Sequence, residues 1–244
     1  MDPIELPYHV PFHPTVQESR IVRHILEKCV PTEIALLIMH LGYSPWLARR
    51  RAEAKEYQSL APEPNIAGIY LSTTTPIPRG FRSNRIIFQT RAADQGWATF
   101  GGEGTFNNSH TWFDASILRP LAPRAQENEH MVLEHAMANE WNDIASARDA
   151  LHERGWTFVV SQDGSITWRV CNNVTAEENH RNYRVEWARG VPTQVENELA
   201  EGKGEGFLEL LQPGCIVVLW ARAEEHLWCN KVSAATIEIE LDVP

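Results

Sequence analysis

The sequence lacks the motifs that would identify a chemistry at once. It has four cysteines, Cys29, Cys171, Cys215 and Cys229. They show no CxxC spacing and no paired histidines, so we predict buried free thiols rather than a zinc site or a redox dithiol. No serine or cysteine stands in a GxSxG elbow. The pattern of His130, Glu134 and His135 is more typical of a solvated helix face than of a metal site. We therefore expect no metal and no cofactor.

Positive charge and long apolar runs are also scarce. The 22 lysines and arginines are outnumbered by 32 acidic residues, which gives a formal charge of −10. Nucleic acid is therefore excluded as an expected partner, because it would need a basic stripe. The basic run Arg49–Arg51 is interpreted as the C-terminal end of a helix, where cations are favoured.

No apolar stretch reaches the length of a membrane span, and residues 1–10 do not resemble a secretory signal. These features predict a cytoplasmic protein without a membrane partner. Homo-oligomerisation is left open by the sequence.

Short β-strands dominate what is there, and they are organised around residues 85–118. Residues 85–91 are rich in β-formers, and residues 110–118 alternate. Phe113, Ala115 and Ile117 share one face, and His110, Trp112, Asp114 and Ser116 share the other. Further strands are predicted at 69–72, 156–161, 165–172, 183–188, 206–211, 215–221 and 235–241. Many short strands with too few helices for βαβ units predict a mainly β protein, an antiparallel jelly-roll-like β-sandwich.

Two helical regions interrupt this pattern. Residues 1–64 are predicted to be a helical N-terminal segment after an extended arm, with helices near 15–26, 31–42 and 45–57. Each helix carries one apolar stripe, so we expect the segment to dock on the sandwich domain of residues 65–244. Within that domain, residues of about 126–154 are predicted to form an inserted helix that ends at Gly155.

Several strand and turn sequences resemble a fungal domain that occurs alone or fused to ankyrin-like or F-box-like segments. The pieces that carry the resemblance are IIFQTRAADQGW, GTFNNSHTWFDASI, WRVCNNVTA with YRVEW, and LQPGCIVVLWARA. They cover roughly residues 69–241, and the motif Pro31-Thr32-Glu33-Ile34 is also typical of the group. Two features depart from it, because Cys215 replaces an acidic residue and the segment 126–154 is longer than usual.

The resemblance implies a β-sandwich more firmly than an activity, since the family is largely without assigned chemistry. A weaker similarity, of overall design, is to stand-alone fungal pericyclases that work without a cofactor. These include hetero-Diels–Alderases, which join a tropolone quinone methide to a humulene-type terpene. No catalytic residue of those enzymes can be matched onto this chain.

Nine tryptophans are many for 244 residues, and several stand on strands beside polar side chains. A group of them could line a pocket for a flat, small apolar or aromatic substrate. For each tryptophan alone, packing in the core is the favoured interpretation. The predicted substrate-binding residues are Gln89, Trp97, Trp112, Trp187, Arg222 and Trp228.

The predicted catalytic residues are Arg91, Asp94 and His110. Arg91 could polarise a carbonyl or oxyanion, and His110 is the best-placed candidate base. The alternative is structural: an Arg91–Asp94 bridge or an Asp-Gln-Gly turn would fix the loop. Two functions follow, a cofactor-independent cyclase of fungal natural-product biosynthesis, or a non-catalytic module that binds a ligand, glycan or protein.

Overall fold

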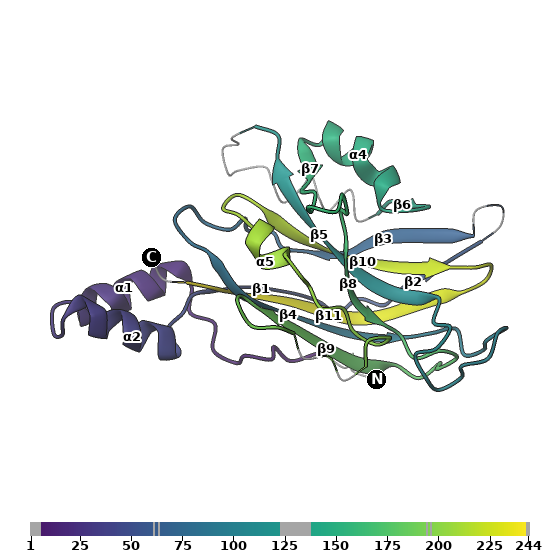
Figure 1. Cartoon of the computed structure of the whole chain (residues 1–244), viewed down its shortest axis with the longest axis horizontal. Helices are drawn as coiled ribbons and strands as arrows, with labels where there is room; N and C mark the ends of the chain where they lie inside the picture. The colour runs from purple at the N-terminus through teal and green to yellow at the C-terminus, as the bar shows by residue number, and fades with distance from the viewer. Residues whose placement is uncertain are drawn as a thin grey trace.

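The protein is a sandwich of two antiparallel β-sheets, as predicted (Figure 1). The computed structural model describes residues 6–60, 62, 64–122, 138–193, 195 and 197–242. The first sheet has the order β1-β11-β4-β9, with β2 also paired to β11. Its strands are β1 (Trp46–Arg51), β2 (Lys55–Gln58), β4 (Ser83–Ala93), β9 (Arg181–Ala188) and β11 (Cys229–Leu241).

The second sheet has the order β6-β3-β10-β5-β7, with β8 also paired to β5. Its strands are β3 (Asn65–Ser72), β5 (Thr111–Pro120), β6 (Glu140–Trp141), β7 (Trp156–Phe158), β8 (Trp168–Asn172) and β10 (Ile216–Glu224). Every pairing among these strands is antiparallel. The mainly β fold predicted from the sequence is therefore confirmed.

The main core lies between the two sheets and follows the alternation of the strands. Phe113, Ala115 and Ile117 of β5 belong to this core. Leu118 of β5 belongs instead to a second core on the other face of the sheet, together with Trp220. The two faces of β5 are thus divided as the sequence predicts, because successive side chains of a strand point to opposite faces.

The second core is covered by a short insertion. It consists of η1 (Ala145–Ala147) and α4 (Arg148–Glu153), which lie against the outer face of the second sheet and lead into its edge strand β7 (Figure 1). The inserted helix predicted over 126–154 is therefore wrong in extent. Residues 126–137 lie outside the described residues, and 140–141 form β6 because they pair with Ala67 and Gly68 of β3. The helix ends before Gly155, which has φ +81°.

Two other predicted elements are corrected by the structure. The third N-terminal helix, over 45–57, is wrong: β1 and β2 occupy this segment because both pair with β11. The sheet thus begins at Trp46, inside the segment expected to be helical, and the arginines Arg49–Arg51 do not cap a helix. The strand predicted over 206–211 is the short helix α5 (Phe207–Leu210), which follows the left-handed residue Gly206. A short apolar run cannot distinguish a buried strand from a buried helical turn.

The two remaining N-terminal helices, α1 (Val16–Leu26) and α2 (Thr32–Gly42), form a hairpin beyond one end of the sheets (Figure 1). Thr15 and Glu18 form a capping box at the start of α1. The hairpin is anchored at its base, where Val16 packs on the main core and Arg20 stacks over Phe81. Ile21 and Ile25 of the α1 stripe and all four members of the α2 stripe, Ile34, Leu37, Ile38 and Leu41, are exposed, however, and not buried against the sandwich as expected.

The described part of the N-terminal arm, residues 6–14, has no helix or strand, bends at 9–11, and crosses the outer face of the first sheet. The backbone amides of His9 and Val10 donate to the carboxylate of Glu238 at 2.9 and 3.0 Å, and Gln89 donates to the Pro7 carbonyl at 3.0 Å. Glu238 is fully buried beneath the arm. These bonds satisfy a carboxylate that would otherwise be costly to bury.

Candidate functional site

Arg91 and Asp94 do not form the bridge considered from the sequence. Arg91, on the outer face of β4, donates to Asn182 at 3.0 Å. Asp94 is fully buried and accepts hydrogen bonds from the backbone amides of Gln95 and Ala176. Burial raises the pKa of Asp94 to about 6, although the two backbone hydrogen bonds oppose the shift. Residues three apart in a strand point to opposite faces, which explains the separation.

Gln95, like Asp94, holds the loop after β4 in place through hydrogen bonds. Its side-chain amide donates to the Trp97 carbonyl at 2.6 Å, and its side-chain oxygen accepts from the Cys229 amide at 3.1 Å. Asp94 and Gln95 therefore join the loop after β4 to the segments around Ala176 and Cys229. This geometry favours the structural interpretation of the Asp-Gln-Gly turn.

Three predicted site residues meet at the edge of the sandwich. The ring centroids of Trp97 and Trp228 are 5.9 Å apart, and His110 lies edge-on to Trp228 at 4.6 Å. Phe100 is 6.1 Å from His110. Trp97 is 42% exposed and Phe100 62%, whereas Trp228 is buried. We call Trp97, Phe100, His110 and Trp228 the aromatic rim; Trp97 and Phe100 are its exposed members.

Trp112 and Arg222 come together elsewhere, on the outer face of the second sheet. The guanidinium carbons of Arg169 and Arg222 lie 4.4 and 5.1 Å from the Trp112 ring centroid. Asp114 accepts from the Trp112 indole at 2.8 Å, from Arg169 at 3.0 Å and from Arg222 at 3.4 Å. Burial lowers the pKa of Arg222, and Asp114 opposes that shift. The polar groups of this cluster bond to one another, which is typical of a structural network.

The last two predicted binding residues lie apart from both clusters. Gln89 is held under the N-terminal arm, where it also donates to Glu238 at 3.1 Å. Trp187 is buried in the main core, with its ring 5.1 Å from Phe88 and 5.0 Å from Phe207. The six predicted substrate-binding residues are thus divided among four places, so they do not line a common aromatic pocket.

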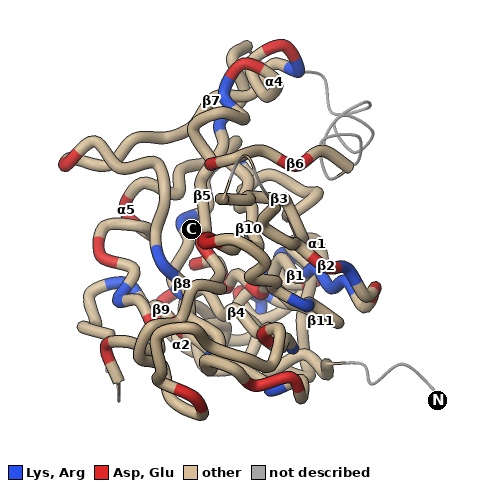
Figure 2. Tube along the Cα trace, turned by 90° about the vertical axis from the view of Figure 1, so that its right-hand side faces the viewer, with Lys and Arg blue, Asp and Glu red and all other residues tan. Residues whose placement is uncertain are grey.

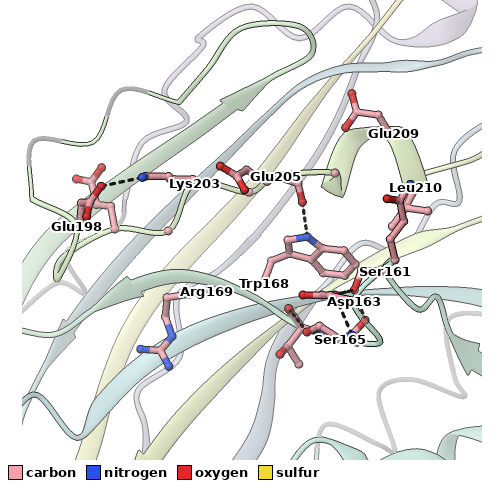
Figure 3. A pocket seen from close by; sticks show the side chains of 16 residues that line it. Ser161, Asp163, Ser165, Trp168, Arg169, Glu198, Lys203, Glu205, Glu209 and Leu210 are labelled. Carbon is pink, nitrogen blue, oxygen red and sulfur yellow. Dashed lines mark hydrogen bonds and ion pairs between the residues drawn. The ribbon is translucent and has the colours of Figure 1, made fainter.

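An open groove of about 790 Å³ lies beside Trp168, at the start of β8 (Figure 3). The turn of residues 161–165 forms one side of it, and residues 198–206 with α5 form the other. Five carboxylates line it: Asp163, Glu198, Glu201, Glu205 and Glu209. Two cations, Arg169 and Lys203, also line it. None of the predicted site residues lines the groove, and no sequence motif predicts it. Its one signal in the sequence is the acidic, glycine-rich run ENELAEGKGEG.

Internal contacts hold the groove in shape. The Trp168 indole donates to the Glu205 carbonyl at 2.8 Å, and this hydrogen bond joins β8 to the segment 198–206 on one side of the groove. Asp163 accepts from the Ser161 hydroxyl and the Ser165 amide, and these hydrogen bonds lower its pKa. A Cβ atom at Gly204 would lie 2.0 Å from the Trp187 ring. Glycine is therefore required at position 204 for the segment 198–206 to pack this closely on the Trp187 ring.

Both cations of the groove already have acidic partners. Lys203 pairs with Glu198 at 2.7 Å, which lowers the pKa of Glu198 and raises that of Lys203. Arg169 pairs with Asp114, outside the groove, and in Figure 3 it extends away from the Trp168 indole. Among the carboxylates, Glu209 pairs with Arg189, outside the groove, at 3.3 Å. The lining still holds five carboxylates against two cations, which is a formal surplus of negative charge. Elsewhere acidic and basic residues are interspersed along the chain (Figure 2).

Within the described ranges, no group of three or more histidine, cysteine or acidic side chains is arranged to hold a metal ion. No helix in the described part of the chain is long and apolar enough to span a membrane. No family model matches the chain, and neither does any curated protein. The resemblance to the fungal domain therefore stays a prediction.

Proposed function

We propose that this protein is a binding module whose groove beside Trp168 takes a positively charged, extended ligand such as a lysine- or arginine-rich peptide segment. The observation that carries the proposal is the lining of the groove, which holds five carboxylates and two cations. Both cations are already ion-paired, and of the carboxylates Glu198 pairs with Lys203 and Glu209 with Arg189. A cationic ligand adds favourable charge–charge contacts, whereas an anionic one meets repulsion.

The dimensions and surroundings of the groove support the same function. Its volume of about 790 Å³ falls in the usual range for ligand sites, roughly 300–1,000 Å³. The formal charge of −10 attracts cations over longer distances and speeds their association at low salt. The shape is fixed before binding by the bonds of Trp168 and Asp163, so little conformational freedom is lost when a ligand enters.

Calorimetric titration tests the proposal, with hexalysine as the probe and hexaglutamate as the opposite-charge control. We expect hexalysine alone to bind, with an affinity that falls steeply as salt is raised. Glu205→Gln should weaken binding several-fold, since it removes roughly 1 kcal/mol of attraction. Glu209→Gln should weaken it less, because Glu209 already pairs with Arg189 at 3.3 Å. Glu103→Gln is the matched control, because Glu103 is an exposed carboxylate outside the groove. Equal weakening by all three changes, or no binding at low salt, contradicts the proposal.

The cofactor-independent cyclase of fungal natural-product biosynthesis is a second proposal, and the aromatic rim supports it. Trp97 offers an exposed ring face on which a flat apolar substrate can stack. The His110 Nδ1 atom is buried and makes no hydrogen bond, although a Glu224 oxygen lies 3.4 Å away, so a polar group of a substrate that enters beside the ring would satisfy it. Proximity and one polarising hydrogen bond are the two effects that a cycloaddition can use.

The cyclase proposal is tested by incubating the protein with a quinone-methide precursor and a terpene diene. The expected result is a changed product ratio and enantiomer composition, which His110→Phe abolishes while keeping an aromatic ring beside Trp228. A product mixture identical to that formed without protein counts against catalysis. It leaves the binding proposal unaffected, because the rim and the groove share no residue.

A further inference from the structure

The helical hairpin α1–α2 carries an apolar surface that nothing in the described chain covers. Its members are large aliphatic residues with exposed fractions from 37 to 77%. They are Ile21, Ile25, Ile34, Leu37, Ile38 and Leu41; we call this set the hairpin face. Phe12 and Tyr43, in contact with each other at 5.5 Å, are partly exposed as well. Such a concentration of exposed apolar side chains on a protein surface marks an interaction site.

The spacing of these residues is that of a helix–helix seam. In α2 they fall at steps of three and four residues, which forms one continuous stripe. Ala35 and Met39, on another side of α2, are fully buried, and Ser19 of α1 donates to the Tyr43 carbonyl at the end of α2. These buried residues mark the inward-facing side of each helix.

The exposed stripes of the two helices lie on the same side of the hairpin. In each right-handed helix the stripe is rotated in the same sense from the inward-facing residues, when viewed from the helix N-terminus. The short turn 27–31 makes the helices run in opposite directions (Figure 1). Equal rotations on antiparallel helices bring both stripes to the same side of the plane through the two helix axes.

The size of the surface matches one half of a protein dimer interface. With about half of each side chain exposed, the hairpin face together with Phe12 and Tyr43 presents on the order of 800 Å², the share of one partner in a standard-size interface. The largest apolar patch of a typical monomer is smaller, about 300–600 Å².

The charges of the hairpin favour a second copy as the occupant. Residues 15–43 contain three acidic residues, Glu18, Glu27 and Glu33, and three cations, Arg20, Arg23 and Lys28. This segment is therefore neutral within a chain of formal charge −10, and it can meet its own copy without the repulsion that the rest of the surface would impose. A neutral apolar seam is also self-complementary about a two-fold axis.

We propose that two copies of this chain associate through the hairpin face, so that α1 and α2 of each form a four-helix arrangement with their counterparts. The hairpin lies at the end of the sheets, and the groove does not include any of its residues. The dimer therefore goes beyond the proposed function, because it leaves both grooves accessible.

Cys29 provides a direct test on the full chain. It is the one exposed cysteine of the four, and it lies in the turn between α1 and α2; the other three are buried. A spin label on Cys29 should give a defined label-to-label distance in pulsed electron paramagnetic resonance at micromolar concentration. Light scattering should give twice the 27.7 kDa mass of the chain. Loss of the distance on dilution with unlabelled protein would confirm that it arises between copies.

A charge substitution on the face separates this dimer from any other. Leu37→Glu with Leu41→Glu should give a monomer that remains folded, because both side chains are already exposed. Leu60→Glu is the matched control, and the protein should stay dimeric. Leu60 is 53% exposed and follows β2, which pairs with the start of β11, whereas the hairpin precedes β1, which pairs with the end of β11. A monomeric wild-type protein overturns the proposal, even if the hairpin binds a different protein. A dimer that survives Leu37→Glu with Leu41→Glu overturns it too.

Discussion

The buried carboxyl group of Asp94 should make folding stability depend on pH in an unusual direction. Its folded pKa of about 6 lies above the ordinary value of 3.8. Below pH 3.8 the Asp94 carboxyl group is protonated in both the folded and the unfolded state. Between 3.8 and 6 the unfolded state ionises first, so stability falls as pH rises. Above 6 both states are ionised, and the loss is complete at about 3 kcal/mol, from roughly 1.4 kcal/mol for each pKa unit.

Asp94→Asn isolates this contribution from those of all other groups. The asparagine oxygen can accept from the Gln95 or the Ala176 amide but not from both, so the variant should be less stable than wild type by about 1–3 kcal/mol at low pH. It carries no ionisation cost. As pH rises from 3.8 to above 6, the wild type should therefore lose about 3 kcal/mol of unfolding free energy relative to the variant.

Urea unfolding, from the ordinary aspartate pKa to well above pH 6, measures that difference. Asp149→Asn, at an exposed position on α4, is the control for removal of a negative charge. If the wild-type and Asp94→Asn curves stay parallel over this range, or diverge in the opposite direction, burial does not raise the Asp94 pKa and our account of this loop is wrong.

Two further predictions concern groups that the fold holds in place. Asp114→Asn should lower the unfolding free energy by about 3–5 kcal/mol, because it leaves the largely buried guanidinium of Arg222 without its carboxylate; a loss below about 1 kcal/mol in urea unfolding would show that the network is not needed. Gly204→Ala should cost more than Gly190→Ala, although both residues have positive φ, because only the former places a Cβ against the Trp187 ring. Placing an alanine at positive φ costs about 1–2 kcal/mol of stability in both variants. Equal melting temperatures of the two variants would refute the steric argument.

The parts of the fold with strong periodicity could be predicted from the sequence. The alternation in residues 110–118 correctly separates the core face of β5 from its outer face. The steps in α1 and α2 correctly identify helices, but not what covers them. A stripe shows that a face is apolar, whereas burial depends on where the chain places it. The segment 45–57 was misjudged because pairing with β11 outweighs its local preferences.

The candidate groove was beyond sequence reasoning because it joins segments that are distant along the chain. Asp163 lies in a turn that the sequence does predict, yet Glu205 reaches the same groove from a loop some forty residues later. Neither segment carries a motif by itself. The nine tryptophans predict a binding pocket that the structure does not assemble, because indole rings suit both core packing and ligand stacking. Only Trp97 is substantially exposed among the predicted tryptophans.

Fluorine NMR of protein labelled with fluorotryptophan tests most directly whether the groove binds cations. The chain has nine tryptophans, and Trp168→Phe identifies the resonance of the groove. On titration with hexalysine, we predict that the Trp168 resonance shifts in a saturable manner and returns when salt is added, while the Trp97 resonance stays in place. A titration that leaves Trp168 unchanged, or that moves only Trp97, would contradict the claim that the groove is the binding site.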